Sequence, residues 1–181
     1  GNEYFGKQDH GRTGLILKVT AADAIKLSNN LEANDNLSDI RQTPTPHVLL
    51  ADDHDIYRVG LSSILQAGSR AVVFCEACSF DDALDHLAAS PIEIAIFDLD
   101  MPGMNGPETL RQVRIIYPNV TMIIVSACTD QAIVTAALAI GVDAYISKST
   151  SLPTMVHKIW STHSNRQRQT QTAVAGAERN S

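Results

Sequence analysis

The apolar run Ile92-Glu-Ile-Ala-Ile-Phe97 is followed at once by the acidic segment Asp98-Leu-Asp100. A short, nearly continuous apolar run of this kind is typical of a strand that is buried on both faces of a parallel sheet. Two similar runs precede it and two follow it along the chain. They cover Val48–Ala51, Ala71–Cys75, Val120–Val125 and Val142–Ile146.

Segments with helical spacing separate these runs, and capping or turn residues mark where the segments begin or end. The start signals are Ser79-Phe-Asp-Asp82, Asn105-Gly-Pro-Glu108 and Thr129-Asp130, and Gly141 marks one end. Short apolar strands that alternate with helices form a parallel sheet covered on both faces. We therefore predict an α/β fold, a flavodoxin-like (βα)5 doubly wound parallel sheet with strand order 2-1-3-4-5.

Three zones of the chain differ in composition. Residues 1–46 form an N-terminal extension and linker, with one candidate helix at Ala21–Ala33 and two prolines near the end. Residues 47–163 contain the alternating pattern and form the predicted folded domain. Residues 164–181 are polar, and we predict a disordered tail there.

Composition and charge argue against several classes of function. The net charge of -6 and the pI of about 5.4 disfavour binding to nucleic acid or to anionic membranes. No apolar run is long enough to span a bilayer, and no secretory signal is visible. The three cysteines do not make a disulfide scaffold, and the spacing of Cys75 and Cys78 indicates packing more than redox or metal chemistry. We therefore expect a cytoplasmic protein.

Polar residues follow four of the five predicted strands. Because the carboxyl ends of parallel strands meet at one edge of the sheet, we expect these side chains to lie together. They are Asp52 and Asp53 after the first strand, Asp98 after the third, Ser126 after the fourth and Lys148 after the fifth.

This combination of side chains has a chemical logic. Three neighbouring carboxylates repel one another, and a hard divalent cation such as Mg²⁺ removes the conflict by taking oxygen ligands. A carboxylate beside Mg²⁺ can act as the nucleophile toward a phosphoryl group. Lys148 and Ser126 can then contact the phosphoryl oxygens. The sequence thus predicts a magnesium-dependent phosphoryl site centred on Asp98.

Four stretches carry a resemblance to a known family. They are Val48-Leu-Leu-Ala-Asp-Asp-His-Asp55, Ile96-Phe-Asp-Leu-Asp-Met-Pro-Gly-Met-Asn-Gly106, Val125-Ser-Ala127 and Ala144-Tyr-Ile-Ser-Lys148. Residues 47–163 resemble the receiver domain of bacterial two-component response regulators. The Asp-Asp-His start and the lack of a proline after Lys148 are most similar to the NarL/FixJ (LuxR-type) branch.

The resemblance implies Mg²⁺ as the cofactor and a sensor histidine kinase or phosphotransfer protein as the partner. It implies a protein that catalyses only its own phosphoryl transfer and dephosphorylation. One departure is Ser149, which stands where many receivers carry proline. The implied roles are phosphoacceptor for Asp98, metal-binding acids for Asp52 and Asp53, third metal ligand for the backbone carbonyl of Asp100, phosphate contact for Ser126, Ala127 and Lys148, and aromatic switch for Tyr145.

Parts of the sequence also bear on two other functions. Phe97-Asp-Leu-Asp100 also resembles the nucleophile motif of haloacid-dehalogenase-type phosphatases, but in that family the nucleophile strand comes first in the core. The NarL/FixJ branch usually continues into a DNA-binding helix-turn-helix, for which the residues after His163 are too few. The chain therefore either signals through protein contacts alone or is a fragment of a transcription regulator. In both cases we expect no direct nucleic-acid binding by this chain.

Two features of the sequence, the segment Gln131–Val142 and His54, each allow two interpretations. The segment Gln131–Val142 contains no charged residue. It is either a deeply packed helix or a contact face, and the second interpretation predicts a phosphorylation-dependent homodimer. His54 is predicted to lie at the surface beside the site, with a role in metal binding as the minor alternative.

Overall fold

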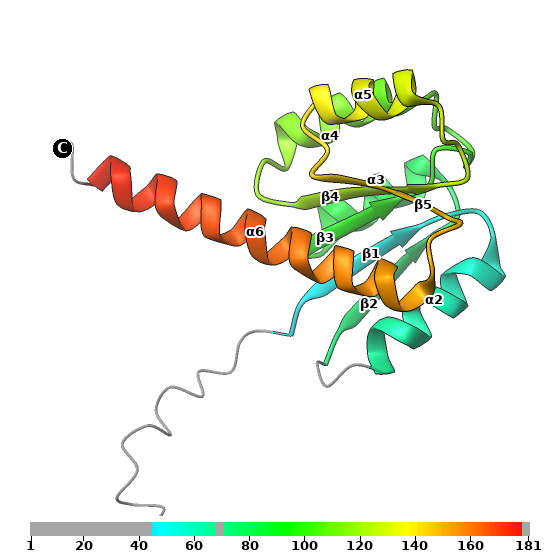
Figure 1. Ribbon diagram of the computed structural model, residues 1–181. Helices are drawn as coiled ribbons and strands as arrows, with labels where there is room; N and C mark the ends of the chain where they lie inside the picture. The colour runs from blue at the N-terminus through cyan, green and yellow to red at the C-terminus, as the bar shows by residue number, and fades with distance from the viewer. Residues whose placement is uncertain (1–44, 68–70, 179–181) are drawn as a thin grey trace, which may run out of the picture. The chain divides into compact units, whose positions relative to one another are not determined.

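The computed structural model describes residues 45–67 and 71–178 (Figure 1). Contacts within the chain divide it after Thr43, and all the described residues belong to the second unit. The candidate helix Ala21–Ala33 and most of the predicted linker lie outside the described residues.

Five parallel strands form one sheet in the order β2-β1-β3-β4-β5, as the sequence predicts. β4 is buried along its whole length, and β1 and β3 at the centre of the sheet are buried except for one residue each. The strands are β1 (His47–Ala51), β2 (Val73–Ala77), β3 (Ile92–Phe97), β4 (Thr121–Ser126) and β5 (Ala144–Ser147).

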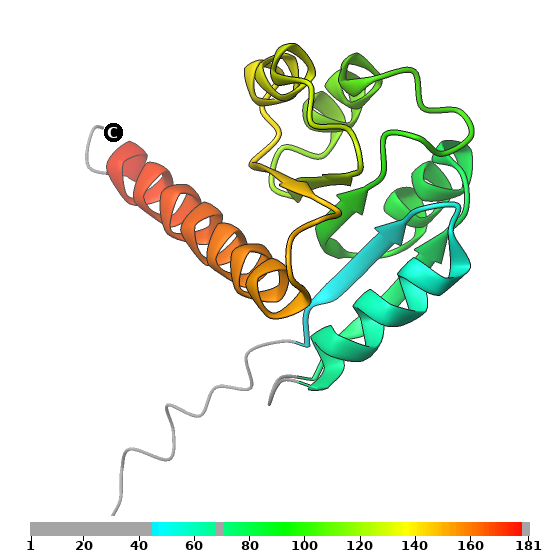
Figure 2. The same cartoon turned by 45° about the vertical axis from the view of Figure 1, so that its right-hand side comes forward.

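Within residues 45–67 and 71–178, four α-helices and one 3₁₀ turn connect successive strands and a fifth α-helix follows the last strand, and these helices cover both faces of the sheet (Figure 2). One face carries α2 (Asp55–Ala67) and α6 (Leu152–Glu178), whose side chains form a buried cluster with alternate residues of the strands. The other face carries α3 (Phe80–Ala89), α4 (Leu110–Ile116) and α5 (Gln131–Ala139), which bury the remaining strand residues. The doubly wound arrangement is therefore confirmed.

The helix start signals are confirmed at two of three places. The Ser79 hydroxyl accepts a hydrogen bond from the Asp82 amide, and the Asp130 carboxylate accepts one from the Ala132 amide. At the third place the predicted cap residue Asn105 is wrong, whereas the early proline, Pro107, is confirmed. A 3₁₀ turn, η2 (Pro107–Thr109), precedes α4, and Gly106 with a φ of 76° occupies the cap position. This left-handed conformation strongly favours glycine.

β2 begins and ends two residues later than predicted. It pairs with β1 from Val73 to Ala77, so Cys75 lies in the middle of the strand and not at its end. The strand ends at Ala77, two residues before Ser79, which is the N-cap residue of the next helix. Cys75, Cys78 and Cys128 form no disulfide with one another.

The predicted disordered tail is wrong as far as Glu178, because α6 continues through these polar residues. Asp143 anchors the extension by accepting hydrogen bonds from both Arg166 and Arg114. Arg166 also donates to the carbonyl of Pro118. The extension is rich in Gln, Arg and Ala, which are good helix formers. No helix within residues 45–67 and 71–178 is long and apolar enough to cross a membrane.

Candidate functional site

The backbone brings the predicted residues to one edge of the sheet. The Asp52 amide donates to the Ala77 carbonyl, and the Asp98 amide donates to the Ala51 carbonyl, so both aspartates directly extend the strand ladder. Lys148 is fixed in the same way by a backbone hydrogen bond of 2.9 Å from its amide to the carbonyl of Ser126. The convergence predicted from the strand ends is therefore seen in the structure.

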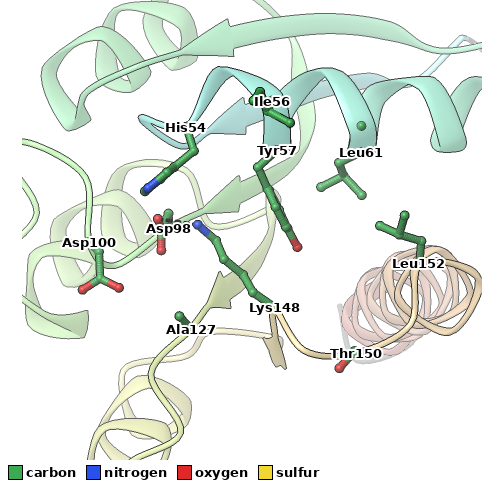
Figure 3. Close-up of a pocket in the computed structure, with 11 residues that line it drawn as sticks. His54, Ile56, Tyr57, Leu61, Asp98, Asp100, Ala127, Lys148, Thr150 and Leu152 are labelled. Carbon is green, nitrogen blue, oxygen red and sulfur yellow. Dashed lines mark hydrogen bonds and ion pairs between the residues drawn. The ribbon is translucent and has the colours of Figure 1, made fainter.

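Lys148 connects two of the carboxylates. Its Nζ lies 2.7 Å from Asp52 Oδ2 and 2.7 Å from Asp98 Oδ2. Figure 3 shows the lysine side chain reaching toward Asp98 from the strand-5 side of the pocket. Desolvation, the largest single influence, opposes the charge of Lys148. The hydrogen bonds and the attraction to Asp52 and Asp98 together outweigh it and raise the pKa of Lys148 above its usual value.

Asp52 and Asp53, the acid pair, lie in a tight turn between β1 and α2. Asp52 Oδ1 accepts a hydrogen bond of 2.9 Å from the His54 amide. His54 Nδ1 lies 2.8 Å from Asp53 Oδ1 and 3.2 Å from Asp52 Oδ1. Arg58 stabilises the same turn, because its guanidinium donates to the backbone carbonyl of Asp52 and forms an ion pair with Asp55. Hydrogen bonds to the side-chain carboxylate of Asp52 and to its backbone carbonyl thus both stabilise the turn.

The donor atoms fit a divalent cation. One ligand atom from each of Asp52, Asp53, His54 and Asp98 can be chosen so that all lie within 4.8 Å of one another. Asp98 is only 2 % exposed, and its Oδ1 has no hydrogen-bond partner. A buried carboxylate oxygen without a partner is costly, so this atom calls for a proton donor or a cation. Oxygen ligands of this kind suit Mg²⁺.

The β4 end of the pocket contains the remaining predicted contacts. Ser126 is fully buried, and its hydroxyl accepts a hydrogen bond from the Cys128 amide. Tyr145 donates from its hydroxyl to the Cys128 carbonyl at 2.8 Å, and its ring packs against the core that includes α5. Burial, the largest influence, raises the pKa of the Tyr145 hydroxyl. Ala127 is exposed and borders the pocket, as does Asp100.

The segment after Lys148 departs from the proline pattern without disturbing the lysine. The Lys148–Ser149 peptide bond is trans. The Ser147 hydroxyl lies 2.8 Å from the Ser149 hydroxyl and accepts a hydrogen bond from the Ser149 amide. A local polar turn thus stands where many members of the family carry proline.

An open cavity of about 640 Å³ adjoins the carboxylates. Figure 3 shows Ile56, Tyr57 and Leu61 of α2 on one side of it and Leu152 of α6 on another, with Asp98 and Lys148 at its polar end. Ile56 is 90 % exposed, which is unusual for a large apolar side chain. The polar pocket therefore opens beside an apolar surface.

Two residues of the site, Tyr57 and Arg58, were not predicted from the sequence. The Tyr57 ring lies 4.7 Å from Lys148 Nζ, a distance suited to a cation–π interaction, and its hydroxyl contacts Met155 Sδ. Arg58 holds the acid-pair turn. The one available signal was the spacing of Asp55 and Arg58, three residues apart on a helix, which allows their ion pair.

Fold and pocket together define a doubly wound α/β domain that gathers three carboxylates and a lysine at the carboxyl edge of its sheet. Residues 48–160 match the family model described as response regulator receiver domain. The chain belongs to this family. The haloacid-dehalogenase alternative is not supported.

The chain is similar to response regulators of the predicted branch. It is 34 % identical over 118 residues to the response regulator protein VraR of Staphylococcus saprophyticus, covering 65 % of this chain and 56 % of VraR. The signal receiver domain of a putative response regulator NarL from Mycobacterium tuberculosis has a TM-score of 0.61 at 28 % identity, covering 67 % of this chain and 98 % of that domain.

A LuxR-family two-component response regulator from Aurantimonas sp. SI85-9A1 gives a TM-score of 0.63 at 25 % identity. The match covers 68 % of this chain and 88 % of that structure. These likenesses agree with the NarL/FixJ (LuxR-type) resemblance of the sequence. The chain spans about half the length of the curated relatives it matches, as the 56 % coverage of VraR illustrates.

Proposed function

We propose that this chain receives a phosphoryl group on Asp98 and thereby switches its contacts with other proteins. The observation that carries the proposal is the unpaired, buried Oδ1 of Asp98 among the carboxylates of Asp52 and Asp53. The phosphoryl donor would be a phosphohistidine on a sensor kinase or phosphotransfer protein. A carboxylate oxygen of Asp98 forms a bond to phosphorus, the phosphorus–nitrogen bond breaks, and the donor imidazole leaves with its electron pair.

The residues of the pocket divide the work of binding and orientation. Asp52, Asp53 and Asp98, with the backbone carbonyl of Asp100, would hold Mg²⁺. Bound Mg²⁺ supplies positive charge that offsets the charge of the phosphoryl oxygens. The Nζ of Lys148 already lies 2.7 Å from Asp98 Oδ2, and it would donate a hydrogen bond to the phosphoryl group as well.

At the β4 end of the pocket, Ser126 and Tyr145 would respond to the bound phosphoryl group. Ser126 would exchange its contact with the Cys128 amide for a hydrogen bond that it donates to a phosphoryl oxygen. Tyr145 is tied to the Cys128 carbonyl, so a shift of the β4–α5 loop would reach the Tyr145 ring. In this structure the ring already packs against the core, and the expected switch is a change in its hydroxyl contact.

The apolar surface beside the pocket suits the donor protein. Ile56 of α2 and Leu152 of α6 are exposed and line the cavity, and Val59 of α2 is also exposed. A partner that covers them would bring its phosphohistidine to the polar end, where Asp98 lies. We place this exchange in the cytoplasm, and we expect no direct DNA binding by this acidic chain. If the chain is part of a longer regulator, the response would pass to its output domain.

The direct test is phosphorylation of the wild-type chain by a small phosphodonor such as acetyl phosphate. With Mg²⁺ present, we expect one phosphoryl group per chain, and this group should be lost in alkali as an acyl phosphate is. With a chelator in place of Mg²⁺, labelling should fall strongly because the three carboxylates then repel the anionic donor. Intact-mass measurement checks both results. Equal labelling with and without Mg²⁺ would contradict the magnesium role.

A further prediction concerns assembly through α5. The face of this helix carries no charge, Ala136 and Ala139 are exposed, and Leu138 is 49 % exposed. We expect phosphorylation to strengthen self-association here, and Ala136→Glu to abolish that gain by placing a charge in the interface. Sedimentation of phosphorylated chains gives the mass. Ala88→Glu, on the exposed side of α3, is the matched control. An undiminished phosphorylation-dependent mass in Ala136→Glu would exclude this face.

A further inference from the structure

His54 lies closer to the cation site than its exposure suggests. Its side chain is 66 % exposed, yet Nδ1 is 2.8 Å from Asp53 Oδ1 and 3.2 Å from Asp52 Oδ1. The hydrogen bond from its amide to Asp52 Oδ1 fixes the start of the side chain at the rim. Figure 3 shows His54 extending from the α2 side toward the region of Asp98. A nitrogen donor therefore stands beside the carboxylates.

A second, independent observation points into the same space. Asp98 Oδ1 is buried and has no partner, whereas Asp98 Oδ2 is held by Lys148. Lys148 likewise takes Oδ2 of Asp52 and leaves Oδ1 to the histidine side. One donor atom each from Asp52, Asp53, His54 and Asp98 falls within 4.8 Å of the others. The unpaired carboxylate oxygen and the imidazole nitrogen can thus face one cation.

From this geometry we infer that His54 is a ligand in the cation site and makes it favour borderline divalent cations, such as Ni²⁺ and Co²⁺, over Mg²⁺. The inference rests on the proposed function, because it concerns the same cation site. Imidazole binds Ni²⁺ and Co²⁺ well, and the affinity of such N/O sites rises along the first-row series. Mg²⁺ prefers oxygen ligands and keeps several waters, so it has little to gain from a nitrogen.

The alternative role for His54 is that of a hydrogen-bonding partner or counter-ion of the carboxylates. The two roles predict different patterns. A ligand adds affinity for Ni²⁺ and little for Mg²⁺, whereas a positioning partner acts on both cations through Asp53. A positively charged counter-ion repels both cations, so its loss would tighten both. The ratio of the two affinities therefore separates a ligand from the other roles.

The experiment titrates the chain with NiCl₂ and with MgCl₂ by calorimetry. His54→Phe should lower Ni²⁺ affinity by at least about 10-fold, since loss of even an outer-shell partner costs about 10–100-fold. Its Mg²⁺ affinity should change little. His54→Gln should behave alike, and two variants guard against a packing effect of the phenylalanine. His157→Phe, at an exposed position of α6, should bind both ions as wild type does.

The location of binding is checked by NMR. Paramagnetic Ni²⁺ should broaden the amide signals of residues 52–55 and Asp98 in the wild-type chain, and excess Mg²⁺ should restore them. An unchanged Ni²⁺ to Mg²⁺ affinity ratio in His54→Phe, whether both affinities fall, rise or stay, would overturn the role of His54. Failure of the wild-type chain to bind Mg²⁺ at all would instead contradict the proposed function.

Discussion

The Asp98→Asn variant is expected to take up no phosphoryl group from acetyl phosphate or from a phosphohistidine partner. The amide has nearly the shape of the carboxylate, so the fully buried position at the end of β3 should still be filled. Its nitrogen and weakly basic oxygen do not replace an anionic nucleophile. Removal of a covalent nucleophile typically lowers the rate by several orders of magnitude, so we expect a loss of at least about 100-fold.

The neighbouring Asp100→Asn variant is the matched control. Its side chain is exposed, and only its backbone carbonyl is assigned to the site, so it should retain substantial labelling. Intact-mass measurement after incubation with donor and Mg²⁺ gives the extent of labelling, and peptide mapping gives its position. If Asp98→Asn were labelled as fully as wild type, the phosphoacceptor would have to be another residue, and the assignment of the pocket would fail.

The fold could be predicted closely because the strong signals lie in the most buried elements. The apolar run Ile92–Phe97 is buried along nearly its whole length, so its composition directly records its environment. The edge strand β2 is less buried, and its predicted bounds slipped by two residues. The extension of α6 was missed because its order depends on contacts with Asp143 and Pro118, which are distant in the sequence.

The core of the site was also predictable, since backbone topology alone brings strand ends together. Asp52, Asp98, Ser126 and Lys148 follow directly from that rule. His54 and Arg58 do not, because their roles depend on which way the side chains just before α2 and in its first turn point. Periodicity indicates which face of a helix is buried, but it does not tell which exposed residue folds back onto a neighbouring turn.

The contact of Lys148 with the carboxylates leads to the second large effect. Asp98 and Asp52 have side chains that are only 1 % and 8 % exposed, and Lys148 is the cation that lies 2.7 Å from both. Removing one partner of a buried ion pair leaves uncompensated charge, which is more costly than the pair itself was favourable. Lys148→Met keeps most of the side-chain volume, so the loss is chiefly electrostatic.

We expect Lys148→Met to lower the free energy of unfolding by about 3 kcal/mol in the presence of a chelator. Urea unfolding, followed by circular dichroism, measures this difference. Mg²⁺ should reduce it, because the cation would supply charge that the lysine no longer does. Lys158→Met, at an exposed position of α6, should leave stability almost unchanged. Adding Asp98→Asn to Lys148→Met should cost less than the sum of the single changes, because the two residues are in contact.

The stabilisation by Lys148 should also depend on pH. The pKa of Lys148 is raised in the folded chain, so the folded state favours its charged form. The contribution of Lys148 is therefore fully present below the ordinary lysine value of 10.5 and is lost as the pH rises through the higher folded value. The stability gap between wild type and Lys148→Met should stay constant from pH 7 to about pH 9. It should then close in strongly alkaline solution. A gap that closed near neutral pH would mean that the ammonium group is not what stabilises the carboxylates.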